Sequence, residues 1–260
     1  MRRPQDAVNK SQQPALFLFV VGLFGLGVLA LKYADFALVW QPVPAWLPAR
    51  TAVAYGSGVL MLLLGAGLLF KPTRAWSVRI LFPYLVLWAL LKVPDVVAAP
   101  GVEASWLGLG ELTLFLSGGW TLFARLSELP ESSPLAFLAG DRGVRMARIL
   151  FAVSIVPIGL SHIVYLQATV GYIPYWLPYH EYWAILTGAG QIASGLGVLF
   201  GVLPRIAAWA EAGQITCYTL LVWLPALVTV PNRLHWTAFF ISWIFGAAAY
   251  AVAQNVKKKT

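Results

Sequence analysis

The sequence predicts an all-α, polytopic transmembrane helical bundle of eight helices, arranged as two parallel four-helix repeats. Three observations predict it: the composition, the spacing of apolar runs, and an internal repeat. Of the 260 residues, 60% are hydrophobic and only 11% are charged, whereas soluble domains carry about 25% charged residues. Such a chain has too little charge to cover a water-soluble globule, and we therefore expect a lipid bilayer as its environment.

Apolar runs bounded by proline, glycine and charge predict eight membrane spans. Each run is long enough, or nearly so, to cross about 30 Å of hydrocarbon at a rise of about 1.5 Å per residue. The first span lacks a small-residue cleavage site, so we expect it to be a retained anchor. The expected spans are residues 14–37, 51–70, 75–97, 104–126, 146–168, 181–201, 204–228 and 234–254.

The internal repeat relates a proline- and tryptophan-containing segment in each half. Val43–Pro48 (VPAWLP) and Ile173–Pro178 (IPYWLP) lie 130 positions apart, and at that offset ten of 27 positions are identical without a gap. Four spans per copy give the two halves the same orientation, a parallel duplication. The expected organisation is a tail at 1–13, a first repeat at 14–127, a linker at 128–145, a second repeat at 146–255 and a basic tail at 256–260.

Lysine and arginine are unequally divided between the two sides of this arrangement. Fourteen lie on the side of the N-terminus, and two, Arg50 and Arg233, lie on the other side. Because positive residues collect in cytoplasmic loops, we expect a multi-pass membrane protein with cytoplasmic N- and C-termini. The same bias accounts for the net charge of +8 without a nucleic-acid partner.

Ionisable residues inside the expected spans mark the candidate site. A charge in the bilayer centre costs at least about 2.5–3.5 kcal/mol and is usually functional or paired. Lys32 precedes Asp35 by three residues, as Lys92 precedes Asp95, so each pair shares a helix face and can form an ion pair. With Glu111 at a comparable depth, these five residues predict a polar layer in the first half. The alternative is that the lysines reach the nearby interface.

The second half contributes a histidine and an aromatic cluster. At the 130-residue offset His162 aligns with Lys32, which predicts equal depth for the two. The tryptophan-proline segments fall on the outer face, where they either anchor the chain at headgroup level or cover a cavity. The candidate catalytic residues are therefore Glu111 and His162, and the candidate ligand-binding residues are Lys32, Asp35, Lys92, Asp95, Trp46, Tyr175 and Trp176.

Other polar residues and motifs have simpler interpretations. Glu211 and Gln214 share a face of the seventh span and Gln191 lies at mid-depth on the sixth. We expect bundle-stabilising hydrogen bonds there, with a proton or headgroup path as the alternative. The histidines lack metal-ligand spacing, no nucleotide-binding or nucleophile-elbow motif occurs, and the single Cys217 leaves no cysteine pair. We therefore expect no metal site and no cofactor held by the chain itself.

The stretch from His162 through the IPYWLP motif to Thr187-Gly188, Gly195-Leu196-Gly197 and Arg205 resembles the DoxX-like family of small four-span membrane proteins. The resemblance covers residues 148–254 and, more faintly, 15–126, so the chain resembles a tandem, eight-span member. Members of this family are associated with membrane redox assemblies, including a small subunit of thiosulfate:quinone oxidoreductase. The resemblance implies a plasma-membrane bundle, a quinone or other lipid-like ligand and a redox partner subunit, and it supplies no catalytic residues.

Three functions follow as hypotheses. The first is an accessory or small-molecule-binding subunit, quinone-linked, of a membrane redox system. The second is a membrane enzyme that uses Glu111 or His162 for acid–base chemistry on a lipophilic substrate. The third is a small-solute transporter, which fits less well because the second and sixth spans lack the proline breaks of discontinuous transport helices.

Overall fold

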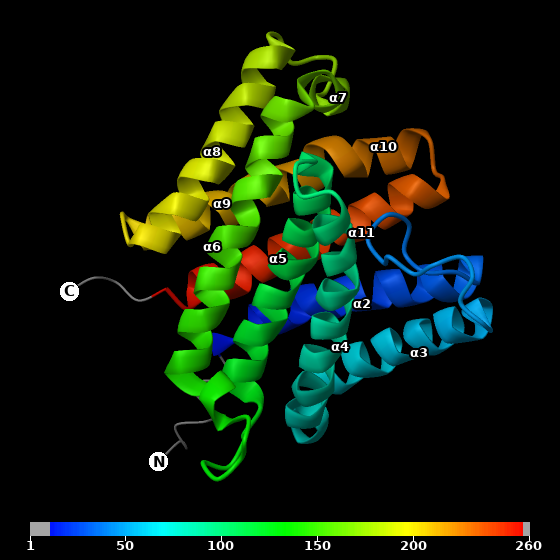
Figure 1. Cartoon of the computed structure of the whole chain (residues 1–260), viewed down its shortest axis with the longest axis vertical. Coiled ribbons are helices and arrows are strands. Elements are labelled where there is room, and N and C mark those ends of the chain that lie inside the picture. The colour runs from blue at the N-terminus through cyan, green and yellow to red at the C-terminus, as the bar shows by residue number, and fades with distance from the viewer. Residues whose placement is uncertain (1–10, 257–260) are drawn as a thin grey trace.

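A computed structural model describes residues 11–256, and within that range the chain is helical and contains no strand (Figure 1). Eight segments are long and apolar enough to cross a membrane, which confirms the predicted all-α membrane bundle. The expected tails at 1–13 and 256–260 lie almost entirely outside the described residues. The spans are α2 (Gln13–Tyr33), α3 (Arg50–Leu69), α4 (Lys71–Ala98), α5 (Glu103–Leu126), α6 (Gly140–Val164), α8 (His180–Phe200), a composite seventh span (Pro204–Thr229) and α11 (Arg233–Gln254).

The fifth span is shorter at its C-terminal end than the sequence predicts. Instead of continuing to residue 168, α6 ends at Val164, and a separate short helix, α7 (Leu166–Tyr172), turns away from it (Figure 1). The hydroxyl of Tyr165 accepts a hydrogen bond from the Ala104 amide at 3.1 Å, a contact with the start of α5 that no local pattern reveals. At its N-terminal end α6 begins at Gly140, inside the expected linker, which leaves residues 127–139 and the short 3-10 helix η1 (Ala136–Leu138) as the connection.

The seventh span is a helix with a π-helical turn. It consists of α9 (Pro204–Tyr218), the π turn η2 (Thr219–Trp223) and α10 (Leu224–Thr229). Pro225 lies at the start of α10 and has no backbone N–H, so an uninterrupted α-helix would lose a hydrogen bond at this point. The π turn accommodates one extra residue there, and such turns are frequent at functional sites.

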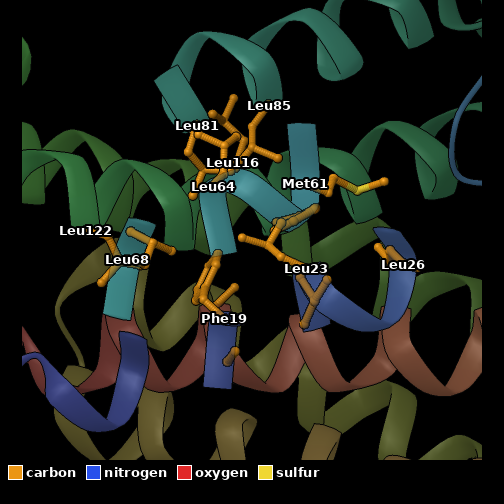
Figure 2. Close-up of a cluster of buried hydrophobic side chains, with 14 of the residues drawn as sticks. Phe19, Leu23, Leu26, Met61, Leu64, Leu68, Leu81, Leu85, Leu116 and Leu122 are labelled. Carbon is orange, nitrogen blue, oxygen red and sulfur yellow. The ribbon is translucent and has the colours of Figure 1, made fainter. Parts of the chain in front are cut away.

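The core of the first half is a leucine-rich cluster contributed by α2, α3, α4 and α5. Phe19, Leu23, Leu64, Leu68 and Leu81 are among its fully or almost fully buried members, and they converge between the helices (Figure 2). The last helix of each half, α5 and α11, pack against each other, while α5 also contacts α6 and α11 also contacts α2. These two helices therefore hold the halves together.

Corresponding helices pack in the same order in the two halves. In the first half α2 packs on α3, α3 on α4 and α4 on α5; in the second, α6 packs on α8, α8 on α9 and α9 on α11. The first contact in each series is a close backbone crossing. A Cβ atom on Gly27 would lie 2.9 Å from the carbonyl oxygen of Gly58, and one on Gly159 would lie 2.6 Å from that of Gly188. Small residues permit this approach in membranes. The duplication itself stays a prediction.

The glycine crossings correct the expected register of the first and fifth spans. Gly58 faces Gly27 and Ala30, whereas Gly188 faces Gly159 and His162. The structural counterpart of His162 is therefore Ala30, and the equivalence with Lys32 is wrong. The chain between the crossing positions is two residues shorter in the second half than in the first, which an alignment without gaps does not detect.

Candidate functional site

A cavity of about 720 Å³ lies in the second half at the C-terminal end of α6, between α6, α7, α8 and the seventh span. This volume is in the range of about 300–1,000 Å³ that is typical of small-molecule sites. Much of the wall is apolar or aromatic, and Tyr172, Trp176 and Leu186 on that wall are more than half exposed. The cavity therefore opens to the outside of the bundle.

The backbone breaks described above build this cavity. Because α6 ends at Val164, α7 and the IPYWLP segment turn over the end of the bundle and supply Tyr172 and Trp176 to the wall. On the opposite side the π turn supplies Leu221, Val222 and Trp223. The rings of Tyr172 and Trp223 lie 5.3 Å apart between centroids and so join the two sides.

His162 is oriented by a hydrogen bond to Thr187. The Thr187 hydroxyl lies 2.8 Å from the carbonyl oxygen of Trp183, to which it donates its proton. It therefore accepts at 3.2 Å from Nδ1 of His162, and this network assigns the Nδ1–H tautomer to a neutral imidazole. Nε2 is left as a hydrogen-bond acceptor for a ligand in the cavity.

Gln214 and Tyr218 complete the polar wall from α9. The amide of Gln214 donates to the carbonyl oxygen of Thr187 at 2.8 Å and to the hydroxyl of Tyr218 at 2.6 Å. The Tyr218 ring packs against the His162 imidazole with 5.7 Å between centroids. Four polar side chains from three helices are thus held in one network before a ligand arrives.

Glu111 reaches the same cavity from the first half. Its helix approaches α6 closely at the preceding residue, since a Cβ on Gly110 would lie 2.8 Å from the carbonyl oxygen of Ser154. The ammonium of Lys92 is the charged group that acts favourably on the Glu111 carboxylate. The indole Nε1 of Trp40 is buried and has no hydrogen-bond partner. The cavity is consequently built by both halves.

The structure brings three of the nine candidate residues together at this cavity, namely Glu111, His162 and Trp176. Trp46 and Tyr175 are 79% and 92% exposed and do not line it. The expected ion pair of Lys92 with Asp95 is present at 2.8 Å. The expected layer of five charged residues in the first half is absent, because Lys32 is exposed and lies over the Tyr33 ring at 5.2 Å.

Asp35 pairs with two arginines instead of with Lys32. Helix α2 ends at Tyr33, and the next residue, Ala34, has a left-handed conformation (φ 51°), which turns Asp35 away from the face of Lys32. Arg50 and Arg233 bind its two carboxylate oxygens. Burial alone would raise the pKa of Asp35, but hydrogen bonds from Arg233, the Phe36 amide and Arg50 outweigh it and hold the pKa below its usual value.

The sequence analysis does not predict Thr187 and Tyr218 as site residues. For Gln214 it expects a bundle-stabilising hydrogen bond, with a proton or headgroup path as the alternative. The spacing of Gln214 and Tyr218 places them on one helix face, which is a weak signal in the sequence. That this face borders a cavity depends on the break at Tyr165 and on the π turn, which are consequences of tertiary packing.

Within residues 11–256, eight helical segments of membrane-spanning length and a ligand-sized cavity open to the bundle's exterior define the class: a polytopic integral membrane protein. The DoxX family model matches residues 143–224, which run from α6 through the π turn and supply most of the cavity wall. This match supports a DoxX-like assignment of the second half; residues 14–127 lie outside it. No curated protein and no solved structure matches the sequence.

Proposed function

We propose that this DoxX-type membrane protein binds a lipophilic, ring-containing small molecule, a quinone or a similar lipid-like compound, in the cavity of its second half. The observation that carries the proposal is that Glu111 and His162, one from each half, line one cavity whose remaining wall is largely apolar and aromatic. A ligand of this kind needs apolar contact over most of its surface and a few placed polar groups at its oxygens.

The polar network suits a compound that carries hydroxyl or carbonyl groups. Nε2 of His162 can accept a hydrogen bond from a quinol hydroxyl, and the hydroxyl of Tyr218 borders the same space. Aromatic side chains such as Trp176 and Trp183 offer faces for stacking on a ring. The protein would act as an accessory subunit of a membrane redox system, with a partner subunit holding the centre that exchanges electrons with the ligand.

The orientation in the membrane is part of the same proposal. The asymmetry of lysine and arginine supports cytoplasmic termini in a plasma membrane, and the cavity then faces the outer leaflet. A tag after Thr260 that was labelled from outside intact cells would contradict this orientation.

A second function, acid–base catalysis on a lipophilic substrate, is favoured by one specific observation. Glu111 and the acceptor nitrogen of His162 share one cavity, as a general acid and a general base would. Turnover by the isolated chain, lost in Glu111→Gln, would establish catalysis. Transport fits less well, because α3 and α8 are unbroken helices.

Ligand binding tests the proposed function directly. The protein, reconstituted in lipid nanodiscs, would be titrated with a short-chain ubiquinone or menaquinone analogue while tryptophan fluorescence is recorded. We expect His162→Ala to weaken binding about five- to tenfold, the value of one lost hydrogen bond of about 1–1.4 kcal/mol. Trp46→Phe is the matched control, since it alters the corresponding motif outside the cavity. The absence of saturable quenching, or equal affinities for wild type and His162→Ala, would overturn the proposal.

A further inference from the structure

A second polar cluster lies deeper in the second half, between α8 and α9. Gln191 and Glu211 are each only 1% exposed, and Nε2 of Gln191 donates to Oε1 of Glu211 at 3.1 Å. The other oxygen of each side chain, Oε1 of Gln191 and Oε2 of Glu211, is buried and has no hydrogen-bond partner. An unpaired buried oxygen is costly, and here two occur in one contact.

Among residues 11–256 no basic side chain is paired with Glu211. On α8 it contacts the uncharged Gln191, while the Ser194 hydroxyl donates its proton to the carbonyl oxygen of Ala207 at 2.7 Å. The ionisable side chains of α11 are Arg233 and His235 at its outer end and Tyr250, which packs on Trp209. On its own helix the ionisable neighbours are Cys217 and Tyr218, about two turns away, and the exposed Arg205. An ionised carboxylate in this position would carry a desolvation cost of several kcal/mol without a partner.

One proton satisfies both unpaired oxygens. If Oε2 of Glu211 carries a hydrogen, it can donate to Oε1 of Gln191, while the amide of Gln191 continues to donate to Oε1 of Glu211. The two side chains then form a closed acid–amide pair with no orphaned atom. We propose that Gln191 and Glu211 form a proton-binding site in the membrane interior, in which Glu211 is held as a carboxylic acid.

The first half shows that packing alone does not require this pair. A Cβ on Gly67 would face Ser77 and one on Gly197 would face Ala207, so the α3–α4 and α8–α9 contacts keep the 130-residue offset. At that offset Gln191 and Glu211 correspond to Met61 and Leu81, which are 2% and 0% exposed and belong to the leucine-rich cluster (Figure 2). The second half thus has two polar side chains at positions that the first half fills with apolar ones. Polar residues that packing does not require are typical of functional positions inside membranes.

The proton site adjoins the cavity. Glu211, Gln214 and Tyr218 follow one face of α9, and the Gln214 amide bonds both Tyr218 and the Thr187 carbonyl. A Cβ on Gly190 would lie 2.9 Å from Oε1 of Gln214, so Gly190 leaves the space that this side chain occupies. Glu211, Gln214 and Tyr218 therefore connect the proton site with the part of the cavity where a ligand oxygen would gain or lose a proton. That coupling, unlike the proton site itself, rests on the proposed function.

Infrared spectroscopy of the full chain in lipid, without added ligand, tests the proton site. We expect the carbonyl absorption of protonated carboxylic acid at neutral pH, shifted in D₂O and reduced in Glu211→Gln. Any part that belongs to Glu111 is identified by its loss in Glu111→Gln. Glu128→Gln is the control, because Glu128 is exposed and outside the spans and should leave the band unchanged. In Gln191→Met the band should move to higher frequency, since the acid loses its hydrogen-bond partner.

A folded Glu211→Gln protein that retains the complete carboxylic-acid band would overturn the proposal. If Glu211→Gln does not fold, the frequency of the carboxylic-acid band in Gln191→Met is the test. An unshifted band in that variant would contradict an acid–amide pair. Because the band is measured without a quinone, it persists even if quinone binding fails. The coupling is tested separately: Glu211→Gln should abolish any pH dependence of quinone affinity that Glu128→Gln retains.

Discussion

Arg233 donates a hydrogen bond from Nη2 to Oδ2 of Asp35 at 2.9 Å, although the two residues are 198 positions apart. It also donates to the carbonyl oxygen of Phe36 at 2.9 Å, while Arg50 binds the other oxygen of Asp35. Arg50 and Arg233 are the two basic residues that the charge distribution assigns to the outer side. Both are therefore bound to one carboxylate, which joins the start of α11 to the end of α2 and so links the halves.

The first prediction concerns the contact of Asp35 with Arg50 and Arg233, which we call the Asp35 clamp. Asp35→Asn removes the charge that two part-buried guanidinium groups share, and we expect a loss of about 1–3 kcal/mol in the free energy of unfolding. The measurement is denaturant unfolding in mild detergent. Asp95→Asn is the control: Asp95 is half exposed and pairs only with Lys92 on its own helix, so its loss should cost less than about 1 kcal/mol. Equal effects would contradict a special role for the clamp.

The second prediction is the pH dependence of the same clamp. The pKa of Asp35 in the folded protein is below its unfolded value, after burial and the opposing hydrogen bonds from Arg233, Phe36 and Arg50 are combined. Its stabilisation is therefore complete above the unfolded pKa of about 3.9 and is lost as the pH falls through the folded value. We expect wild type to lose stability more steeply than Asp35→Asn below about pH 4. Parallel curves would contradict the assignment.

The third prediction tests the glycine crossing under the cavity. Gly159→Ala would place a methyl group 2.6 Å from the Gly188 carbonyl oxygen and force α6 and α8 apart. We expect a stability loss of about 1–3 kcal/mol from this overpacking together with weaker quinone binding, because His162 and Thr187 lie on these two helices. Gly56→Ala is the control, since nothing lies within 4 Å of a Cβ there. That variant should be neutral or stabilised by up to about 1 kcal/mol.

The sequence predicts the spans well because apolar length is a local property. It predicts part of the site for the same reason: Glu111 and His162 are conspicuous as ionisable residues in apolar runs. It does not predict the partners of Lys32 and Asp35: Lys32 lies over the Tyr33 ring, and the left-handed Ala34 separates Asp35 from it. Which ionisable groups share a cavity depends on where α6 breaks and how α5 crosses it. Those are tertiary relationships between distant residues.

The fourth prediction exchanges the deep polar pair for its counterpart in the first half. Replacing Gln191 by Met and Glu211 by Leu together gives the α8–α9 contact the apolar chemistry that Met61 and Leu81 already have in the α3–α4 contact. Replacing a complete buried polar pair by apolar residues of similar volume is often neutral or stabilising, whereas removing one partner leaves the other unsatisfied. We therefore expect the double variant to unfold at the same or higher denaturant concentration than wild type. Glu211→Leu alone should lose about 1–3 kcal/mol, because Gln191 then keeps unpaired buried groups.

The double-mutant cycle should show a coupling energy of about 1–3 kcal/mol between the two positions. The reciprocal change, Leu81→Glu with Met61→Gln, is the matched control: its double variant should be less destabilised than Leu81→Glu alone. If the two positions of the second half behave additively, the side chains do not act as a pair, and the acid–amide site would have to be abandoned.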